Sequence, residues 1–266
     1  MGQSWCGRRA GANAPPLAPP CARPHPTGAC LASAVLPSLS SYGRVKKVLV
    51  IDIGGSHVKL FLTGRRGRVK IPSGPALTPR QMVADVRAAT EGWQYDVVTI
   101  GYPGPVVRGR IMLEPYNLGV GWTRFNFARA LGRPVRLIND AAMQALGSYR
   151  GKSMLFLGLG TGLGTTLVHN GVVVPLEAGH LPYRDGLTFE DVVGDAGLKR
   201  FGKKRWRRDV AIVVDLLLNA LVADYAVLGG GNVRLLDELP PRSRRGNNAN
   251  AFRGGERLWT DDVTYP

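Results

Sequence analysis

The chain has 266 residues, of which 44% are hydrophobic and 20% charged, and this composition excludes a fibrous or fully disordered protein. A net charge of +16 favours anionic partners: nucleic acid, an acidic membrane or a polyphosphorylated substrate. Solubilising surface arginine accounts for the same charge, so charge alone does not choose between these interpretations. The length suits one large domain or two small ones.

All three cysteines, Cys6, Cys21 and Cys30, lie in the first thirty residues. The remainder of the chain therefore has neither a disulfide framework nor a cysteine-ligated zinc site, and we expect no zinc. The best apolar segment, 210–223, is short and carries Asp215 and Asn219, so no membrane span is expected. We expect a cytoplasmic protein.

Residues 1–43 form a separate region that is rich in Pro, Ala and Gly and has no Asp or Glu. Prolines interrupt any helix there, and the apolar run 29–36 is too short and too late for a signal peptide. We expect either a disordered tail or sequence upstream of the true start, with the folded domain beginning at Arg44.

Strands and helices alternate after the tail, which predicts an α/β fold. Thr78-Pro79-Arg80-Gln81 is a capping box that opens a helix reaching about Glu91. Two further helices are expected at 125–131 and 140–149, and a long amphipathic helix at 203–225. Strands are expected at 47–53, 58–63, 68–71, 96–101, 135–138, 153–158 and 226–228, with hairpins at 106–113 and 165–174, the second turning at Asn170-Gly171.

An apolar strand at 48–53 runs into Asp52, Gly54, Gly55 and Ser56, with Lys59 three residues later. Such a strand holds a carboxylate rigidly, and the glycines let backbone N–H groups approach a phosphate closely. Ser56 and Lys59 add further donors. A tight strand turn without any ligand has the same pattern, so later segments decide its role.

A second glycine-rich turn spans 158–164 and contains Gly160, Thr161 and Gly162. A dinucleotide-binding motif must open a helix, whereas the residues after this turn continue as a strand. The pattern favours a hairpin that grips phosphate, and a turn without a ligand is the alternative. Two such turns after similar strands suggest that the chain consists of two related halves.

Asn139-Asp140 ends one predicted strand and starts a helix. Either residue suits a helix N-cap, and Asp140 equally suits a general base for a hydroxyl that attacks a phosphoryl group. Glu177 and His180 are three residues apart and could hold sugar hydroxyls, a metal ion, or simply a turn.

Six motifs occur in one order: Asp52-Ile53-Gly54-Gly55, Gly101-Tyr102-Pro103-Gly104, Asn139-Asp140-Ala141, Gly160-Thr161-Gly162-Leu163-Gly164, Glu177-Ala178-Gly179-His180 and Gly229-Gly230-Gly231-Asn232. In this order they resemble the ROK family of repressors and sugar kinases, and within it the polyphosphate glucokinase and glucomannokinase branch. The resemblance covers about 46–259. It implies an α/β actin-like (ribonuclease H-like) sugar-kinase fold with two α/β domains and a cleft between them.

After the tail at 1–43, the resemblance implies a small domain at 44–138 with the first phosphate loop, and a large domain at 139–266 with Asp140 and the second phosphate loop. It also implies roles for individual residues. Asp140 would be the catalytic base and Asp52 would hold Mg²⁺. The sugar would contact Asn117, Asn139, Glu177, His180 and Gly104. The donor phosphates would contact Gly54, Gly55, Ser56, Lys59, Gly160, Thr161, Gly162, Gly230 and Gly231. Glu190 would be a further sugar ligand, but the region after His180 matches the family pattern only loosely.

The function implied is transfer of a phosphoryl group from inorganic polyphosphate or ATP to a hexose, most simply glucose. The alternative is a non-catalytic sugar-sensing regulator, but residues 1–43 lack the apolar helix pair of a helix–turn–helix domain. A homodimer is expected from the family, and no specific nucleic-acid partner. Basic residues at 199–208 form either a solvated face or a track for a polyphosphate chain.

Overall fold

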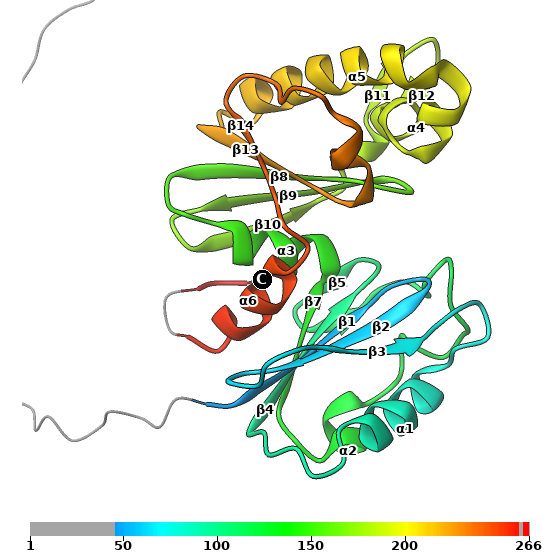
Figure 1. Cartoon of the computed structure of the whole chain (residues 1–266), viewed down its shortest axis with the longest axis vertical. Coiled ribbons are helices and arrows are strands. Elements are labelled where there is room, and N and C mark those ends of the chain that lie inside the picture. The colour runs from blue at the N-terminus through cyan, green and yellow to red at the C-terminus, as the bar shows by residue number, and fades with distance from the viewer. Residues whose placement is uncertain (1–45, 261–262, 266) are drawn as a thin grey trace, which may run out of the picture. The chain divides into compact units, whose positions relative to one another are not determined.

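The computed structural model describes residues 46–260 and 263–265, so the predictions made for residues 1–43 lie outside the described residues. The first sheet has the strand order β3-β2-β1-β4-β7 (Figure 1). Its strands are β1 (Val48–Ile53), β2 (His57–Leu62), β3 (Val69–Pro72), β4 (Val97–Tyr102) and β7 (Val135–Asn139). β1, β2 and β3 pair antiparallel, whereas β1, β4 and β7 pair parallel.

The second sheet repeats this topology in the order β10-β9-β8-β13-β14. Its strands are β8 (Ser153–Leu159), β9 (Leu163–His169), β10 (Val172–Leu176), β13 (Tyr225–Gly229) and β14 (Ser243–Arg245). β8, β9 and β10 pair antiparallel, and β8, β13 and β14 pair parallel. The prediction of two related halves is confirmed, and the glycine turns β1–β2 and β8–β9 hold equivalent places in them.

Six α-helices and two 3-10 helices occur among the described residues. They are α1 (Pro79–Ala89), α2 (Phe127–Leu131), α3 (Asp140–Ser148), α4 (Phe189–Val193), α5 (Asp195–Ala220), α6 (Asn250–Arg257), η1 (Ala178–His180) and η2 (Gly231–Leu235). Short hairpins β5–β6 (Val106–Val107, Arg110–Ile111) and β11–β12 (Pro182–Arg184, Leu187–Thr188) complete the described fold. None of its helices has the length and apolar character that a bilayer crossing requires.

The period-2 alternation of β1 decides which of two cores each of its side chains faces. Leu49, Ile51 and Ile53 face the core that α1 and α2 close. Val48 and Val50 face the opposite core, which contains α3 and α6. Asp52 belongs to this second set by parity, so the strand directs its carboxylate toward the start of α3.

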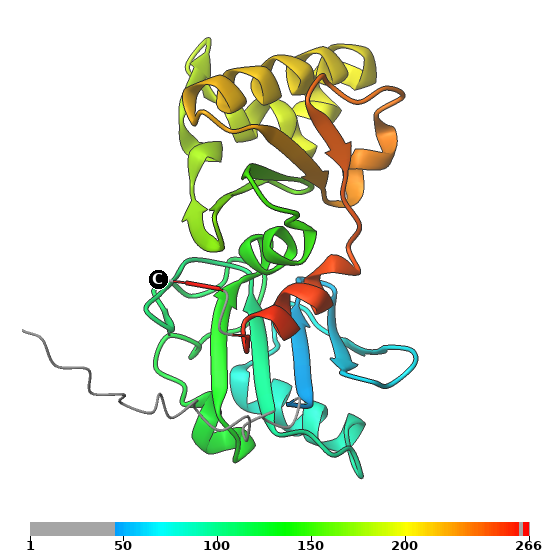
Figure 2. The same cartoon turned by 90° about the vertical axis from the view of Figure 1, so that its left-hand side faces the viewer.

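Helices α3 and α6 lie between the two sheets in both views (Figures 1 and 2). Glycines make their close approach possible: a Cβ added to Gly254 would lie 1.8 Å from the carbonyl oxygen of Met143, and one added to Gly147 would lie 1.8 Å from that of Asn250. Side chains of both helices share a core with Val50 of β1 and Phe156 of β8. Helix α6 therefore joins the C-terminal part of the chain to the first sheet.

Most predicted elements are present within two residues of their expected bounds, and Thr78 caps α1 as predicted by accepting the N–H of Gln81. The long helix begins at Lys203 as predicted, because Gly202, with φ 74° and ψ 160°, breaks α5 and separates 203–220 from the helical residues before it. Its predicted end was wrong, since α5 ends at Ala220 and β13 begins at Tyr225. The sequence reading missed α4, α6, β14 and the β11–β12 hairpin.

The described chain packs as one compact unit. Since α6 returns to β1, no single cut in sequence separates the residues around the two sheets. The boundary between 44–138 and 139–266 stays a prediction.

Candidate functional site

Asp52 lies at the end of β1 with only 6% of its surface exposed. The ammonium of Lys59, on the neighbouring strand β2, donates to Asp52 Oδ2 at 3.0 Å. The register of the β1–β2 pair places the two residues directly opposite each other. One of the predicted donor-phosphate residues is therefore paired with the predicted metal ligand.

Asp140 is the first residue of α3, directly after β7. Its Oδ1 accepts the N–H of Ala141 at 2.7 Å. Burial, with the nearby carboxylate of Asp52 as the second cause, raises the pKa of Asp140 to about 7, against the opposing effects of the Ala141 N–H and Lys59. A carboxylate with this pKa can accept a proton near neutral pH.

Asn139 is the N-cap of α3: its Oδ1 accepts the N–H of Ala142 at 3.0 Å. Its Nδ2 donates to the carbonyl oxygen of Gly104 at 3.1 Å and so ties the loop after β4 to β7. The cap interpretation is therefore confirmed for Asn139, while the role of Asp140 as a base stays a prediction. The Asn139 carboxamide oxygen already has a helix N–H as donor, and its sugar contact stays a prediction.

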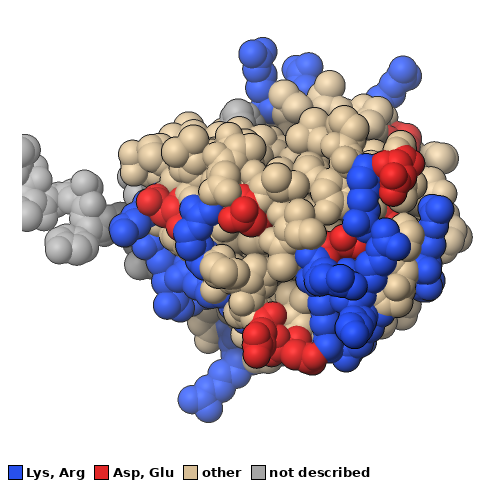
Figure 3. Space-filling model, turned by 90° about the horizontal axis from the view of Figure 1, so that it is seen from above, with Lys and Arg blue, Asp and Glu red and all other residues tan. Residues whose placement is uncertain are grey.

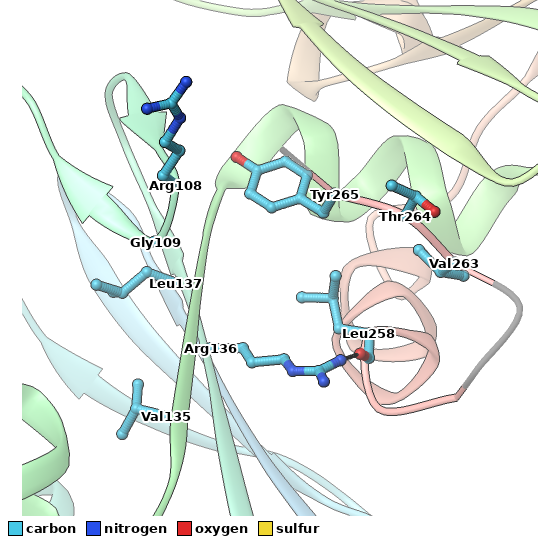
Figure 4. Close-up of a pocket in the computed structure, with 9 residues that line it drawn as sticks. All are labelled: Arg108, Gly109, Val135, Arg136, Leu137, Leu258, Val263, Thr264 and Tyr265. Atoms are coloured by element: carbon cyan, nitrogen blue, oxygen red, sulfur yellow. Dashed lines mark hydrogen bonds between the residues drawn. The ribbon is translucent and has the colours of Figure 1, made fainter.

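A hollow of about 480 Å³ lies beside β7 (Figure 4). Tyr265 lines it, and its hydroxyl accepts the N–H of Asn139 and donates to the carbonyl oxygen of Val106, both at 3.3 Å. The guanidinium of Arg136 donates to the carbonyl oxygen of Leu258 and lies over the ring of Trp259. Arg136 is therefore engaged within the protein, and Arg108 is the other arginine that lines the hollow.

The first glycine turn, Gly54-Gly55-Ser56, is held from one side by Ser73, whose hydroxyl donates to the Gly54 carbonyl oxygen at 2.5 Å. Gly55 and Ser56 are exposed. A Cβ added to Gly55 would lie 3.4 Å from Cβ of Asn117, so the structure brings Asn117 to this turn although 62 residues separate them (117 − 55).

The second glycine turn, Gly160-Thr161-Gly162, contacts the start of α5, where the N–H of Asp195 donates to the Gly160 carbonyl oxygen at 3.0 Å. Asn232 Nδ2 donates to Asp195 Oδ1 at 2.6 Å and joins the turn to the loop after β13. In that loop Gly230 has φ 84°, and an added Cβ would lie 2.1 Å from the Leu159 carbonyl oxygen. A Cβ added to Gly231 would have no heavy atom within 4 Å. The predicted donor residues thus form two groups, one around each turn.

Glu177, directly before η1, and His180, the last residue of η1, are both exposed. His180 Nε2 is 3.9 Å from Glu190 Oε1, and Glu190 Oε2 accepts the N–H of Leu163 at 2.9 Å. The structure therefore brings Glu190 to the same region, although its sequence context was too loose to predict this. The capping box of Thr188 and Asp191, which starts α4, is the signal that could have placed it.

A basic hollow of about 500 Å³ lies beside both Lys59 and the loop after β13. Its cationic lining residues are Lys59, Arg68, Lys70 and Arg234, and the rest of its lining is Gly230, Gly231, Val233, Gly246, Asn247, Asn248 and Ala249. Lys59 and Lys70 are directly opposite each other on β2 and β3. Like charges in that position repel, and an anion between them would relieve the repulsion.

The basic residues at 199–208 lie on α5, on the face shown in Figure 3, where Lys and Arg side chains gather. Arg207 forms an ion pair with Asp237 and donates to the Leu235 carbonyl oxygen, so it belongs to the local packing. Arg200 and Arg205 lie over the ring of Phe201. None of these residues lines the basic hollow. The solvated face therefore accounts for them more simply.

Residues 46–260 and 263–265 contain no group of three or more His, Cys, Asp and Glu side chains that could hold a metal ion. The two carboxylates of Asp52 and Asp140 are hard oxygen ligands. They suit a divalent cation that keeps several waters and takes its other ligands from phosphate.

No protein-family model matches the chain. The polyphosphate glucokinase of Mycobacterium tuberculosis is 27% identical over 212 residues, which cover 72% of this chain and 80% of that protein. The inorganic polyphosphate/ATP-glucomannokinase of an Arthrobacter strain has the same fold, with a TM-score of 0.68 and 22% identity over 80% of this chain and 98% of that one.

A ROK family glucokinase of Streptomyces griseus also shares the fold, with a TM-score of 0.63 and 18% identity, covering 80% of this chain and 98% of that one. A ROK family transcriptional regulator matches with a TM-score of 0.58 and 14% identity over 82% of this chain and 73% of that one, so the fold alone does not distinguish enzyme from regulator. The chain is therefore similar in sequence to polyphosphate glucokinases, and its doubled sheet topology is the actin-like fold that ROK-family sugar kinases share.

Proposed function

We propose that the chain transfers the terminal phosphoryl group of inorganic polyphosphate to a hexose, glucose being the first candidate, and so forms the hexose 6-phosphate. The observation that carries this proposal is Asp140, a carboxylate at the start of α3 with a pKa of about 7. Its carboxylate accepts the proton of the sugar hydroxyl as that oxygen attacks phosphorus, and the bond from phosphorus to the donor's bridging oxygen breaks.

Little further covalent chemistry is needed from the protein, because positioning and charge neutralisation supply most of the catalysis. Asp52, with Asp140 nearby, would hold Mg²⁺ through water, and the cation would neutralise charge on the transferred group. Lys59 is the adjacent fixed cation. Asn117, Asn139, Gly104, Glu177 and His180 would orient the sugar.

Polyphosphate suits the basic hollow better than ATP does. Four cationic side chains line the hollow, and no aromatic side chain is present there to stack on a nucleobase. The proposal is supported by the Mycobacterium relatives, which are named polyphosphate glucokinases. If the protein transferred phosphate from ATP but not from polyphosphate, the donor would instead be a nucleotide.

A coupled assay with glucose, mannose and other hexoses, run with polyphosphate and separately with ATP, tests the proposal. Sugar phosphate should form with polyphosphate, and Asp140→Asn should abolish most of it. A chain that binds a hexose tightly but transfers phosphate from neither donor would instead be a sugar-sensing regulator.

A further inference from the structure

Glu114 anchors the connection between β6 and α2. Its Oε2 accepts the N–H groups of Gly121 and Trp122 at 2.9 and 3.0 Å. Its Oε1 accepts the N–H and the hydroxyl of Thr123 at 3.2 and 2.8 Å. One carboxylate thus closes the loop of residues 115–120 upon itself.

These hydrogen bonds stabilise the ionised form. Burial opposes ionisation, but the donors on Trp122, Thr123 and Gly121 outweigh it and hold the pKa of Glu114 below its ordinary value. Tyr102 supports the same loop from β4, since its hydroxyl donates to the Leu113 carbonyl oxygen at 2.9 Å. The loop therefore has polar anchors at both ends.

Apolar packing alone would hold this loop poorly. Leu118 is buried, but Leu113, Tyr116 and Val120 are 63%, 98% and 74% exposed. Asn117, at the loop's centre, is exposed and lies against Gly55. Pro115 is also buried, and the N–H of Gly119 donates to the Leu77 carbonyl oxygen at 3.0 Å. The hydrogen bonds of Glu114 add to these contacts in holding Asn117 over the first glycine turn.

We propose that Glu114 is a positioning residue that sets hexose affinity: its ionised carboxylate fixes the 115–120 loop and thereby holds Asn117 against the sugar. This inference rests on the proposed function, because it takes Asn117 as a sugar contact. Glu114 itself touches neither substrate nor donor.

Glu114→Gln tests the proposal, because an amide NH₂ replaces one oxygen and faces N–H donors. We expect the KM for glucose to rise about tenfold or more, the effect of losing hydrogen bonds to a charged acceptor. The kcat and the KM for polyphosphate should stay within about twofold, since Asp140 and the basic hollow are untouched. Glu91→Gln, the same change at an exposed glutamate after α1, is the matched control and should change nothing.

Thr123 gives a graded second series. Thr123→Ser keeps the hydroxyl and should behave as the parent, whereas Thr123→Val should raise the KM for glucose by a smaller factor than Glu114→Gln. An unchanged KM for glucose in Glu114→Gln overturns the proposal. The proposal is also overturned if kcat falls, the KM values for glucose and polyphosphate rise by the same factor, and the melting temperature is lowered. That pattern belongs to a purely structural residue.

Calorimetric titration of glucose without a donor keeps this inference separate from the proposed function. If the parent binds glucose but transfers no phosphate, the proposed function fails, while weaker glucose binding by Glu114→Gln still supports the role of Glu114. If parent and variant bind glucose equally, the role of Glu114 fails whatever the catalytic result.

Discussion

The carboxylate of Asp52, at the end of β1, raises the pKa of Asp140, at the start of α3, while Lys59 bonded to Asp52 lowers it. The parity of β1 directs Asp52 to the face that contacts α3, and the end of β7 sets where α3 begins. This pair therefore joins a metal-binding candidate to a base candidate, and both can be tested separately.

Asp140→Asn should lower kcat by about 10²-fold or more, because the amide cannot accept the hydroxyl proton. The KM for glucose should change little, since Asn is nearly isosteric. Steady-state kinetics on the folded variant checks this. Turnover within a few-fold of the parent would remove Asp140 as the base.

The same variant should be more stable than the parent at high pH. Folding raises the pKa of Asp140 from 3.8 to about 7, so ionisation in the folded state costs stability that grows from pH 3.8 and is complete above pH 7. The melting temperature of Asp140→Asn should exceed the parent's at pH 8, and the gap should shrink as the pH falls toward 4. At this size each kcal/mol corresponds to about 2–4 °C. A gap independent of pH would contradict the raised pKa.

The pH profile of kcat/KM should show an acid limb near pH 7, because only the ionised Asp140 accepts a proton. Lys59→Gln removes a charge that lowers this pKa, so the limb should move to higher pH. Lys70→Gln is the control: it lies in the same basic hollow and is no cause of the Asp140 shift, so the limb should stay in place. Identical movement in both variants would argue against a specific role of Lys59.

Arg68→Gln with Lys70→Gln should raise the KM for polyphosphate by about tenfold and make its dependence on salt shallower, because fewer phosphates are neutralised. The KM for glucose should be unaffected. The matched comparison is Lys203→Gln with Lys204→Gln on α5, which lie outside the hollow and should have little effect. A larger loss from the α5 pair than from the hollow pair would restore α5 as the phosphate track.

Gly254→Ala should destabilise the fold, because the new methyl would lie 1.8 Å from the Met143 carbonyl oxygen between α6 and α3. Overpacking of this kind costs about 1–3 kcal/mol. Gly74→Ala, with no atom within 4 Å of the added Cβ, is the control. Thermal unfolding of both variants decides: equal melting temperatures would show that the helices separate without cost.

The sequence was most reliable where a signal is local. The Thr78 cap, the Asn170-Gly171 turn with φ of 48° and 79°, and the hairpin around the second glycine turn all follow from a few neighbouring residues. The long helix was predicted to end too late, because Leu221 continues the apolar spacing although the helix ends at Ala220 and Val222 has φ 51°. Helix α6 was missed because it contains two glycines, which are poor helix formers; they permit close packing, Gly254 on α3 and Gly255 on Val50 of β1.

By itself the sequence determined the doubled strand pattern, both glycine turns and the identity of the two aspartates. Hydrophobic periodicity, turn residues and the order of motifs can all be recognised from residues that are close together in the chain. Only the tertiary structure decided which of these residues meet. Asp52 and Asp140 are 88 residues apart (140 − 52), Asn117 reaches Gly55, and Glu190 reaches His180. The basic hollow likewise combines β2 and β3 with the loop after β13. Such proximity depends on sheet order and helix packing, which fix distances that no local pattern of residues encodes.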